Sequence, residues 1–230
     1  VIQQVYSRIP QHAEILAKEL GASGISSVTR IIRDADIYIF AIADDELYKL
    51  KEWMFTTSRI VVHTAGSVSR DVLKVLTPQY GVLYPLQTLK KDIGVINGIP
   101  FFVDGNSDGI RQQIFDLAKS VSENVQYADD ETRRKLHLGA VVVNNFSNYL
   151  FALTEQYCKN EGLDFKSLSP LIAEGAMRIN SYSPAVLQTG PAFRNDLSTI
   201  SKQRELLQQY PELLRIYELF TEIIASGQRH

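Results

Sequence analysis

Short apolar segments alternate with helical patterns over residues 1–128, and this alternation is the feature that most constrains the fold. The expected strands are residues 1–6, 37–43, 60–64, 81–84, 100–103 and 124–127. The expected helices between them are residues 11–20, 28–32, 45–55, 69–76 and 108–122. The segment 37–43 reads "IYIFAIA" and is apolar at every position, so we expect a central parallel strand buried on both faces. Strands that alternate with helices in this way predict an α/β fold with a doubly wound sheet.

The second half of the chain has a different pattern, with no strand signal after residue 128. Helices are expected at about residues 129–160, 164–180, 196–209 and 211–226. The sequence therefore predicts two domains, an α/β domain over residues 1–128 and an all-α domain over residues 129–230.

The first expected strand ends in Ser7 and Arg8. In a dinucleotide-binding fold the second strand ends at the adenosine ribose, where an arginine accommodates the extra phosphate of NADP. We therefore expect Ser7 and Arg8 to bind NADP(H). Such a strand normally follows a first strand and a glycine-rich turn, but no GxGxxG occurs in the 230 residues. We expect that first strand and turn to precede Val1, so that the sheet of residues 1–128 lacks its first strand.

Composition and charge exclude several classes of function. The formal charge of −2 gives no electrostatic footprint for nucleic acid or an anionic membrane. Cys158 is the only cysteine, which suits a reducing compartment, and we expect a cytoplasmic protein. The four histidines form neither HExxH nor a pair at helical spacing, so no metal site is predicted. Residues 65–69 lack the second glycine of a serine-hydrolase elbow.

Small and polar residues follow three of the expected strands. In open α/β sheets, ligands bind beyond the carboxyl ends of the strands. The residues at these ends that we expect to contact a cofactor are Ala43, Asp44, His63, Thr64, Ala65 and Gly66. After the next strand, we expect Tyr84 to contact the substrate and Gln87 to act in catalysis. The alternative is that all of these are ordinary turn and helix-capping residues, and for Asp44 the sequence favours neither reading.

A narrow polar stripe marks the long helix expected at residues 129–160. At 100° per residue, His137, Asn144 and Asn148 fall within about 20° of one line on a strongly apolar helix. Buried polar side chains require partners. The stripe is either a hydrogen-bonded contact between helices or a catalytic face toward the cofactor cleft, with His137 as a proton donor or a substrate anchor and the two asparagines beside it.

Arg194 is a further candidate, in the segment "QTGPAFRND". Its guanidinium is suited to clamping an anionic group of a substrate. It is equally suited to pairing with a surface carboxylate.

Together the segments "VYSR", "AIADDEL", "VVHTAGS", "GVLYPLQT", "LHLGAVVVNNFSNYL" and "LQTGPAFRND" resemble one family. It is a family of candidate NADP oxidoreductases with a Rossmann-like N-terminal domain and a helical C-terminal domain of unknown function. The family is related to pyrroline-5-carboxylate reductase and to the deazaflavin-dependent NADP reductases. The resemblance implies an NADP cofactor and a homodimer built through the helical domain, and it implies no particular substrate. Asn195 stands where the family pattern has glycine, and Gln203 stands near an expected histidine.

The sequence leaves open two main functions, which belong to different classes. The first is an NADP(H)-dependent oxidoreductase that reduces a small carbonyl or imine substrate held between residues 84–88 and the polar stripe. The second is a non-catalytic dimeric module that binds a nucleotide or a metabolite and regulates through its helices. A bare assembly scaffold is a third reading. NADPH oxidation with a panel of substrates discriminates between the first two, since a regulatory module binds NADPH without turnover.

Overall fold

The computed structural model describes residues 1–89 and 98–227. Contacts divide the chain into two compact units, Val1–Val141 and Val142–His230. The helix that the sequence places first in the second half, α4 (Asp130–Ala140), falls in the first unit.

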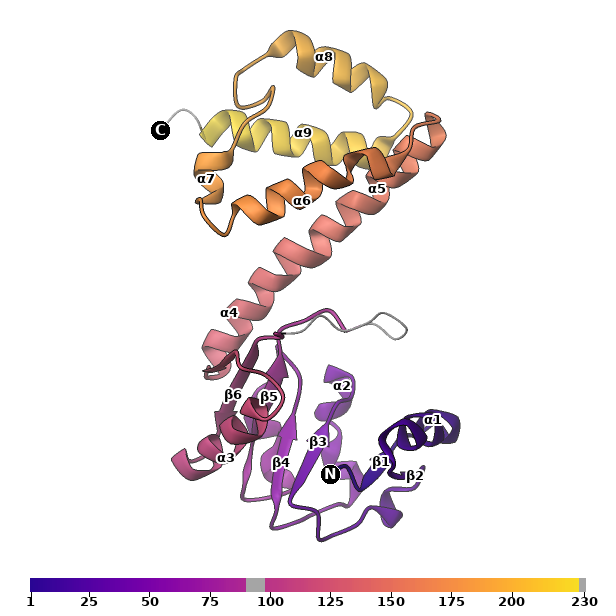
Figure 1. Cartoon of the computed structure of the whole chain (residues 1–230), viewed down its shortest axis with the longest axis vertical. Coiled ribbons are helices and arrows are strands. Elements are labelled where there is room, and N and C mark those ends of the chain that lie inside the picture. The colour runs from indigo at the N-terminus through magenta and orange to yellow at the C-terminus, as the bar shows by residue number, and fades with distance from the viewer. Residues whose placement is uncertain (90–97, 228–230) are drawn as a thin grey trace. The chain divides into compact units, whose positions relative to one another are not determined.

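The first unit holds every strand of the described chain (Figure 1). A two-stranded parallel sheet pairs β1 (Gln4–Tyr6) with β2 (Ser23–Ile25). The five-stranded sheet has the order β3-β4-β5-β6-β7. Its strands are β3 (Ile37–Phe40), β4 (Ile60–His63), β5 (Tyr80–Pro85), β6 (Phe101–Gly105) and β7 (Val125–Tyr127). The α/β prediction is confirmed, and β2 is the one described strand that the sequence did not predict.

Three parallel strands, β3, β4 and β5, form the half of this sheet that carries the candidate site. Strand β6 then pairs antiparallel with β5, and β7 is parallel to β6. An antiparallel neighbour needs no helical crossover, which agrees with the absence of any predicted helix between residues 84 and 100. Because β3, β4 and β5 are parallel, their carboxyl ends lie at the same edge of the sheet.

The most buried strand is β4 and not β3. Val61 packs in one apolar cluster with Leu47 and Leu73, whereas Val62 packs on the opposite face with Ile114. Strand β3 lies at an edge of its sheet, and Ile39 is 52% exposed. The prediction that residues 37–43 are buried on both faces is therefore wrong, because β4 is the only strand to which β3 bonds in the described chain.

Helices and 3-10 turns cover the sheets of the first unit. α1 (Pro10–Leu20) packs on β1 and β2, and α3 (Asp108–Lys119) packs on β5, β6 and β7. The predicted helix at residues 69–76 is a 3-10 turn, Arg70–Val75. The one predicted at 45–55 is divided between α2 (Asp44–Leu47) and a 3-10 turn, Leu50–Trp53. The one predicted at 28–32 is a short 3-10 turn.

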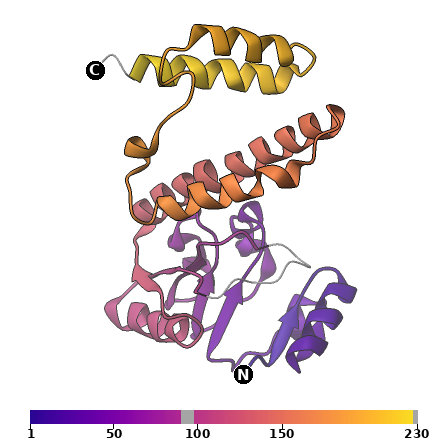
Figure 2. The same cartoon turned by 45° about the horizontal axis from the view of Figure 1, so that its top comes forward.

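The second unit contains helices and turns, and no strand in its described residues. Its helices are α5 (Ser147–Asn160), α6 (Ser169–Arg178), α7 (Pro184–Leu187), α8 (Leu197–Leu206) and α9 (Pro211–Ser226). Figures 1 and 2 show α8 beside α9, and Figure 2 shows α6 running along α5. The start of α9 is fixed to α5 by Tyr210, whose hydroxyl donates to the Glu161 carboxylate at 2.5 Å. In the described residues, no helix of either unit is both long and apolar enough to span a bilayer.

Candidate functional site

The centre of the candidate site is a contact between Tyr84 and His137. Tyr84 lies near the carboxyl end of β5, and His137 lies in α4. The Tyr84 hydroxyl is 2.9 Å from His137 Nδ1, and the two rings meet edge to face at 5.9 Å between centroids. Tyr84 is buried and His137 is half-buried. A phenol and an imidazole in direct hydrogen bond can pass a proton from one to the other.

Gly66 completes this centre from the loop after β4. A Cβ at Gly66 would lie 2.6 Å from His137 Nδ1 and 2.8 Å from Tyr84 Cζ. Both distances are shorter than van der Waals contact permits. Glycine is therefore required here so that the loop backbone can approach both rings.

The loop after β4 runs along one face of α4, one contact per turn. Gly66 lies against His137, the Val68 carbonyl accepts a hydrogen bond from Arg133 Nη2, and the Ser69 hydroxyl donates to the Asp130 carboxylate. The Asp130, Arg133 and His137 side chains are three or four residues apart, the spacing that places side chains on one helix face. We call the loop residues 66–70 together with this face of α4 the seam.

Charged groups fix the seam to the sheet. Asp130 also accepts from the Arg70 backbone N–H at 3.2 Å. The Arg70 side chain donates to Asp104 Oδ2 and to the Gly105 carbonyl, both at 2.7 Å. Desolvation raises the pKa of Asp130, but hydrogen bonds from Ser69, Arg133 and Arg70 outweigh it and hold that pKa below its ordinary value. Burial raises the pKa of Asp104.

His63, a predicted cofactor contact, is enclosed by backbone groups of its own loop. Its side chain is 0% exposed. Nδ1 accepts from the Ala65 backbone N–H at 3.2 Å, and Nε2 lies 3.3 Å from the Ser69 carbonyl. Burial, and then the positive charge of Arg133, lower the pKa of His63 to about 4. The neutral ring therefore shapes the loop from within and presents no surface to a ligand.

The other residues at the strand ends have identifiable contacts. The Asp44 carboxylate accepts from the Ser67 hydroxyl, which joins the loop after β3 to the loop after β4. Asp44 does not cap α2, which has no side-chain cap. Thr64 donates its backbone N–H to the Phe40 carbonyl at 3.3 Å, and Ala43 accepts from the Glu46 N–H at 2.9 Å. Gln87 is exposed, and its amide oxygen accepts from the adjacent Thr88 N–H at 3.2 Å.

Ser7 and Arg8 follow β1 as the sequence predicts. The Ser7 hydroxyl accepts from the Ile9 N–H at 3.2 Å. The Arg8 side chain is 68% exposed and pairs with Glu46 Oε2 at 2.9 Å, while Lys49 pairs with Oε1 of the same carboxylate at 2.9 Å. Solvent weakens an ion pair this exposed, so Arg8 can exchange its partner easily.

The predicted polar stripe crosses a change of helix type after α4. Residues Val141–Phe146 form a π-helical segment, in which the hydrogen bonds span one residue more than in an α-helix. The constant rotation of 100° per residue therefore ends before Asn144 and Asn148 are reached. Both asparagines are exposed in the single chain, as are Leu138, Val143 and Phe146.

Arg194 belongs to the second unit, as do Asn144 and Asn148. It is exposed, and its charge acts on Asp196, whose pKa is lowered chiefly by hydrogen bonds from Thr199. Asn195, which replaces the glycine of the family pattern, has φ +54°. Asparagine is among the residues that best tolerate this left-handed conformation, which explains the substitution.

Arg133 is a buried charged residue of the seam that the sequence did not reveal. It is 0% exposed, although arginine is rarely buried so completely. Its spacing of four residues from His137 was visible in "RRKLH", but nothing in the sequence distinguished it from the exposed Arg134.

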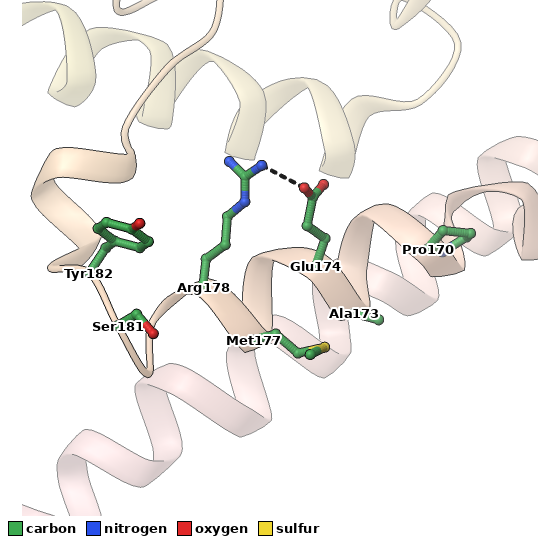
Figure 3. Close-up of a pocket in the computed structure, with 7 residues that line it drawn as sticks. All are labelled: Pro170, Ala173, Glu174, Met177, Arg178, Ser181 and Tyr182. Carbon is green, nitrogen blue, oxygen red and sulfur yellow. Dashed lines mark hydrogen bonds and ion pairs between the residues drawn. The ribbon is translucent and has the colours of Figure 1, made fainter.

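A groove of about 460 Å³ lies on α6 and the turn after it in the second unit (Figure 3). It is lined by Pro170, Ala173, Glu174, Met177, Arg178, Ser181 and Tyr182. Glu174 and Arg178 form an ion pair at 2.5 Å on one side of α6. The groove contains none of the predicted site residues. In the described residues of the whole chain, no cluster of three potential metal ligands occurs.

Comparisons with known proteins agree with this architecture. Residues 99–224 match the domain of unknown function DUF2520. No curated protein matches the sequence. A candidate NADP oxidoreductase from Bacteroides fragilis is 34% identical, with a TM-score of 0.90 over 98% of this chain and 88% of its own.

Two more distant structures share the fold. A 1-pyrroline-5-carboxylate reductase from Streptococcus pyogenes is 14% identical, with a TM-score of 0.60 over 98% of this chain and 89% of its own. A reductive aminase from Aspergillus terreus, solved with NADPH and ethyl levulinate, is 14% identical, with a TM-score of 0.69 over 99% and 86% of the two chains. The matched domain and the 34% identity together show that the chain belongs to the DUF2520 family of candidate NADP oxidoreductases.

Proposed function

We propose that the protein is an NADP(H)-dependent reductase of a small carbonyl or imine substrate, with Tyr84 and His137 as its proton-donating pair. The observation that carries this proposal is the 2.9 Å contact between the Tyr84 hydroxyl and His137 Nδ1 at the carboxyl ends of the parallel strands. Ligands of open α/β sheets bind at this edge. The reductive aminase and the pyrroline-5-carboxylate reductase that share the fold favour an imine or carbonyl group as the site of reduction.

The residues at this edge fit an NADP cofactor. Arg8 is exposed and held by a single surface ion pair, so its guanidinium is available to a phosphate. The loop at Gly66 brings its backbone close to the reacting pair, where a Cβ would block the approach. Bound NADPH would supply the hydride. Ser7 and Arg8 would hold its adenosine end, and residues 64–66 would lie closest to its reactive end.

The pair supplies the proton. If the Tyr84 O–H donates to His137 Nδ1, the imidazole carries its proton on Nε2. His137 then gives the Nε2 proton to the carbonyl oxygen or imine nitrogen and accepts the Tyr84 proton at Nδ1. Tyr84 is left as the phenolate until solvent returns a proton. General acid catalysis of this kind accelerates a reaction by about 10²–10⁴-fold.

The test is NADPH oxidation by the protein with cyclic imines, aldehydes and keto acids. Tyr84→Phe should reduce turnover by about 10²-fold or more. Tyr80→Phe is the matched control, since Tyr80 is on the same strand and its hydroxyl bonds to Asp71 instead. Arg8→Ala should weaken NADPH binding more than NADH binding. Tight NADPH binding with no turnover on any substrate would favour the non-catalytic regulatory module.

We also propose that the protein is a homodimer through its second unit. In the described residues of that unit, the buried apolar side chains are Cys158, Ile200 and Leu207. The exposed large apolar side chains are Val142, Val143, Phe146, Tyr149, Phe151, Leu163, Leu171, Met177, Ile179, Tyr182, Val186, Leu197, Leu206, Leu219, Phe220 and Ile223. A surface this apolar marks an interaction site, and a second copy of the chain is the occupant that the implied family dimer favours. The α6 groove, with exposed Met177 and Tyr182, would form part of it.

Light scattering tests the dimer. The wild-type protein should be dimeric at tens of micromolar, and Met177→Glu should shift it toward the monomer. Lys159→Gln, on the exposed end of α5, is the control, because it changes the net charge by the same −1 as Met177→Glu. A wild-type protein that is monomeric at this concentration would refute the dimer.

A further inference from the structure

The buried Arg133 carries a positive charge that its surroundings neutralise only in part. Its Nη2 donates to the Val68 carbonyl and to Asp130 Oδ1, the latter at 2.8 Å. Nε and Nη1 are buried without a hydrogen-bond partner among the described residues. Asp130 divides its carboxylate between Arg133, Ser69 and the Arg70 N–H. Burying a charge with unpaired N–H donors lowers the stability of the fold, so such a residue is a candidate for a functional role.

The position of the Arg133 charge, close to the Tyr84–His137 pair, suits a role in the proposed reaction. Arg133 lies one helical turn before His137 on the face of α4 that forms the seam. Its guanidinium also fixes the loop that holds Gly66 against the Tyr84–His137 pair. Charges are screened least in such a buried site.

We propose that Arg133 is a positioning residue of the proton relay: it holds the seam together, and its buried charge stabilises the phenolate that Tyr84 becomes when His137 gives up its proton. The inference rests on the proposed function. In the balanced step, the Nε2 proton of His137 goes to the substrate, the Tyr84 hydroxyl proton goes to Nδ1, and the hydride comes from NADPH. Only Tyr84 changes charge in the relay, from neutral to anionic.

The groups that face Tyr84 act on it in opposite directions. Burial raises the pKa of Tyr84, Arg133 lowers it, and Asp44 raises it. His137 is its hydrogen-bond partner. Loss of the Arg133 charge should therefore move the titration of Tyr84 to higher pH, and loss of the Asp44 charge should move it to lower pH.

The experiment measures the titration of residue 84 directly and needs no substrate. Difluorotyrosine is placed at position 84 of the full-length natural protein, which brings the phenol titration into a range where the protein is folded, and its ¹⁹F signal is followed against pH. Arg133→Met should shift the midpoint upward, and Arg133→Lys should return it toward the wild-type value. Arg134→Met is the matched control, because it removes the same charge from the next, exposed residue and should leave the midpoint unchanged.

Two results would overturn the inference. One is an Arg133→Met protein that melts at a lower temperature and titrates at the wild-type midpoint, since a purely structural arginine would behave so. The other is an equal shift in Arg134→Met. If Arg133→Met does not fold, Arg133→Gln decides: it keeps an N–H donor for the Val68 carbonyl and Asp130, removes the positive charge, and should shift the midpoint upward, whereas an unchanged midpoint refutes the proposal.

The two proposals fail in different ways. If the midpoint shifts as expected but no substrate is reduced, the electrostatic role of Arg133 stands and the reductase function does not. If substrates are reduced but the midpoint is unmoved, the reductase function stands and Arg133 is only structural.

Discussion

The two units differ in where their apolar side chains lie. The first unit buries three apolar clusters around its five-stranded sheet, with β4 covered on both faces. The described residues of the second unit bury few large side chains and expose many. The first unit therefore has a core of its own, on which the Tyr84–His137 pair is held in place. The described residues of the second unit expose much apolar surface, which is why we propose chemistry for the first unit and dimerisation for the second.

The largest effect should come from truncating a core residue of the first unit. Ile114 is 0% exposed, and Ile114→Ala should lower the free energy of unfolding by about 2–5 kcal/mol. Leu171 in α6 is 66% exposed, and Leu171→Ala should change it by less than about 0.5 kcal/mol in dilute protein. Urea denaturation at low concentration measures both. Equal losses in the two variants would contradict the difference between the units.

The variants Ile114→Ala and Leu171→Ala also test the proposed dimer, at higher protein concentration. If the second unit is covered by another copy, Leu171→Ala should become more destabilising as the protein concentration rises, because dimerisation adds to apparent stability. Ile114→Ala should show the same loss at every concentration. A Leu171→Ala effect that does not depend on concentration would remove α6 from the interface.

The next effect is a pH dependence confined to the first unit. Because the pKa of His63 is about 4 in the folded chain and 6.5 as a free side chain, the unfolded state binds more protons between these values. The stabilisation is complete above pH 6.5 and is lost as the pH falls toward 4, by up to about 3 kcal/mol. Trp53 is the only tryptophan and lies in the first unit, so its fluorescence reports this loss. His63→Gln should flatten the dependence over this range, and an unchanged slope would show that His63 is not its cause.

A smaller change in stability should distinguish alanine at Gly66, in the seam, from alanine at Gly139, in α4. A Cβ at Gly66 would overlap both rings of the pair, so Gly66→Ala should cost about 1–3 kcal/mol. A Cβ at Gly139, in α4, would meet no atom within 4 Å, and Gly139→Ala should stabilise the helix by about 0.5–1 kcal/mol. Thermal unfolding measures both. A tolerated alanine at 66 would mean that the loop is not held against the rings.

The sequence predicted the strands and the loops that follow them because these signals are local. An apolar run bounded by turn residues identified β4 and β5, and thus the edge at which Gly66 and Tyr84 meet His137. Three features were not accessible in this way. The π-helical segment at Val141–Phe146 has no sequence signal that we recognised, and it interrupts the α-helical repeat that the stripe of His137, Asn144 and Asn148 assumed. The exposure of Ile39 depends on which strands pair with β3, a tertiary property.

The third feature is the role of individual polar residues. His63 and His137 are both histidines near the predicted site, yet one is enclosed by backbone groups and the other meets Tyr84. Arg133 and Arg134 are adjacent in sequence, and only the first is buried. Burial and hydrogen-bond partners set these roles, and for His137 and Arg133 they depend on contacts between residues more than 50 positions apart in the chain.

The measurement that tests the central claim most directly is a double-mutant cycle of NADPH turnover across Tyr84 and His137. If the two side chains form one proton relay, Tyr84→Phe and His137→Gln each break the same step, and the double variant should be no slower than the slower single variant. If the rate losses of the two single variants multiply in the double variant, the residues act independently. That result would contradict the account of Tyr84 and His137 as a single proton-donating pair.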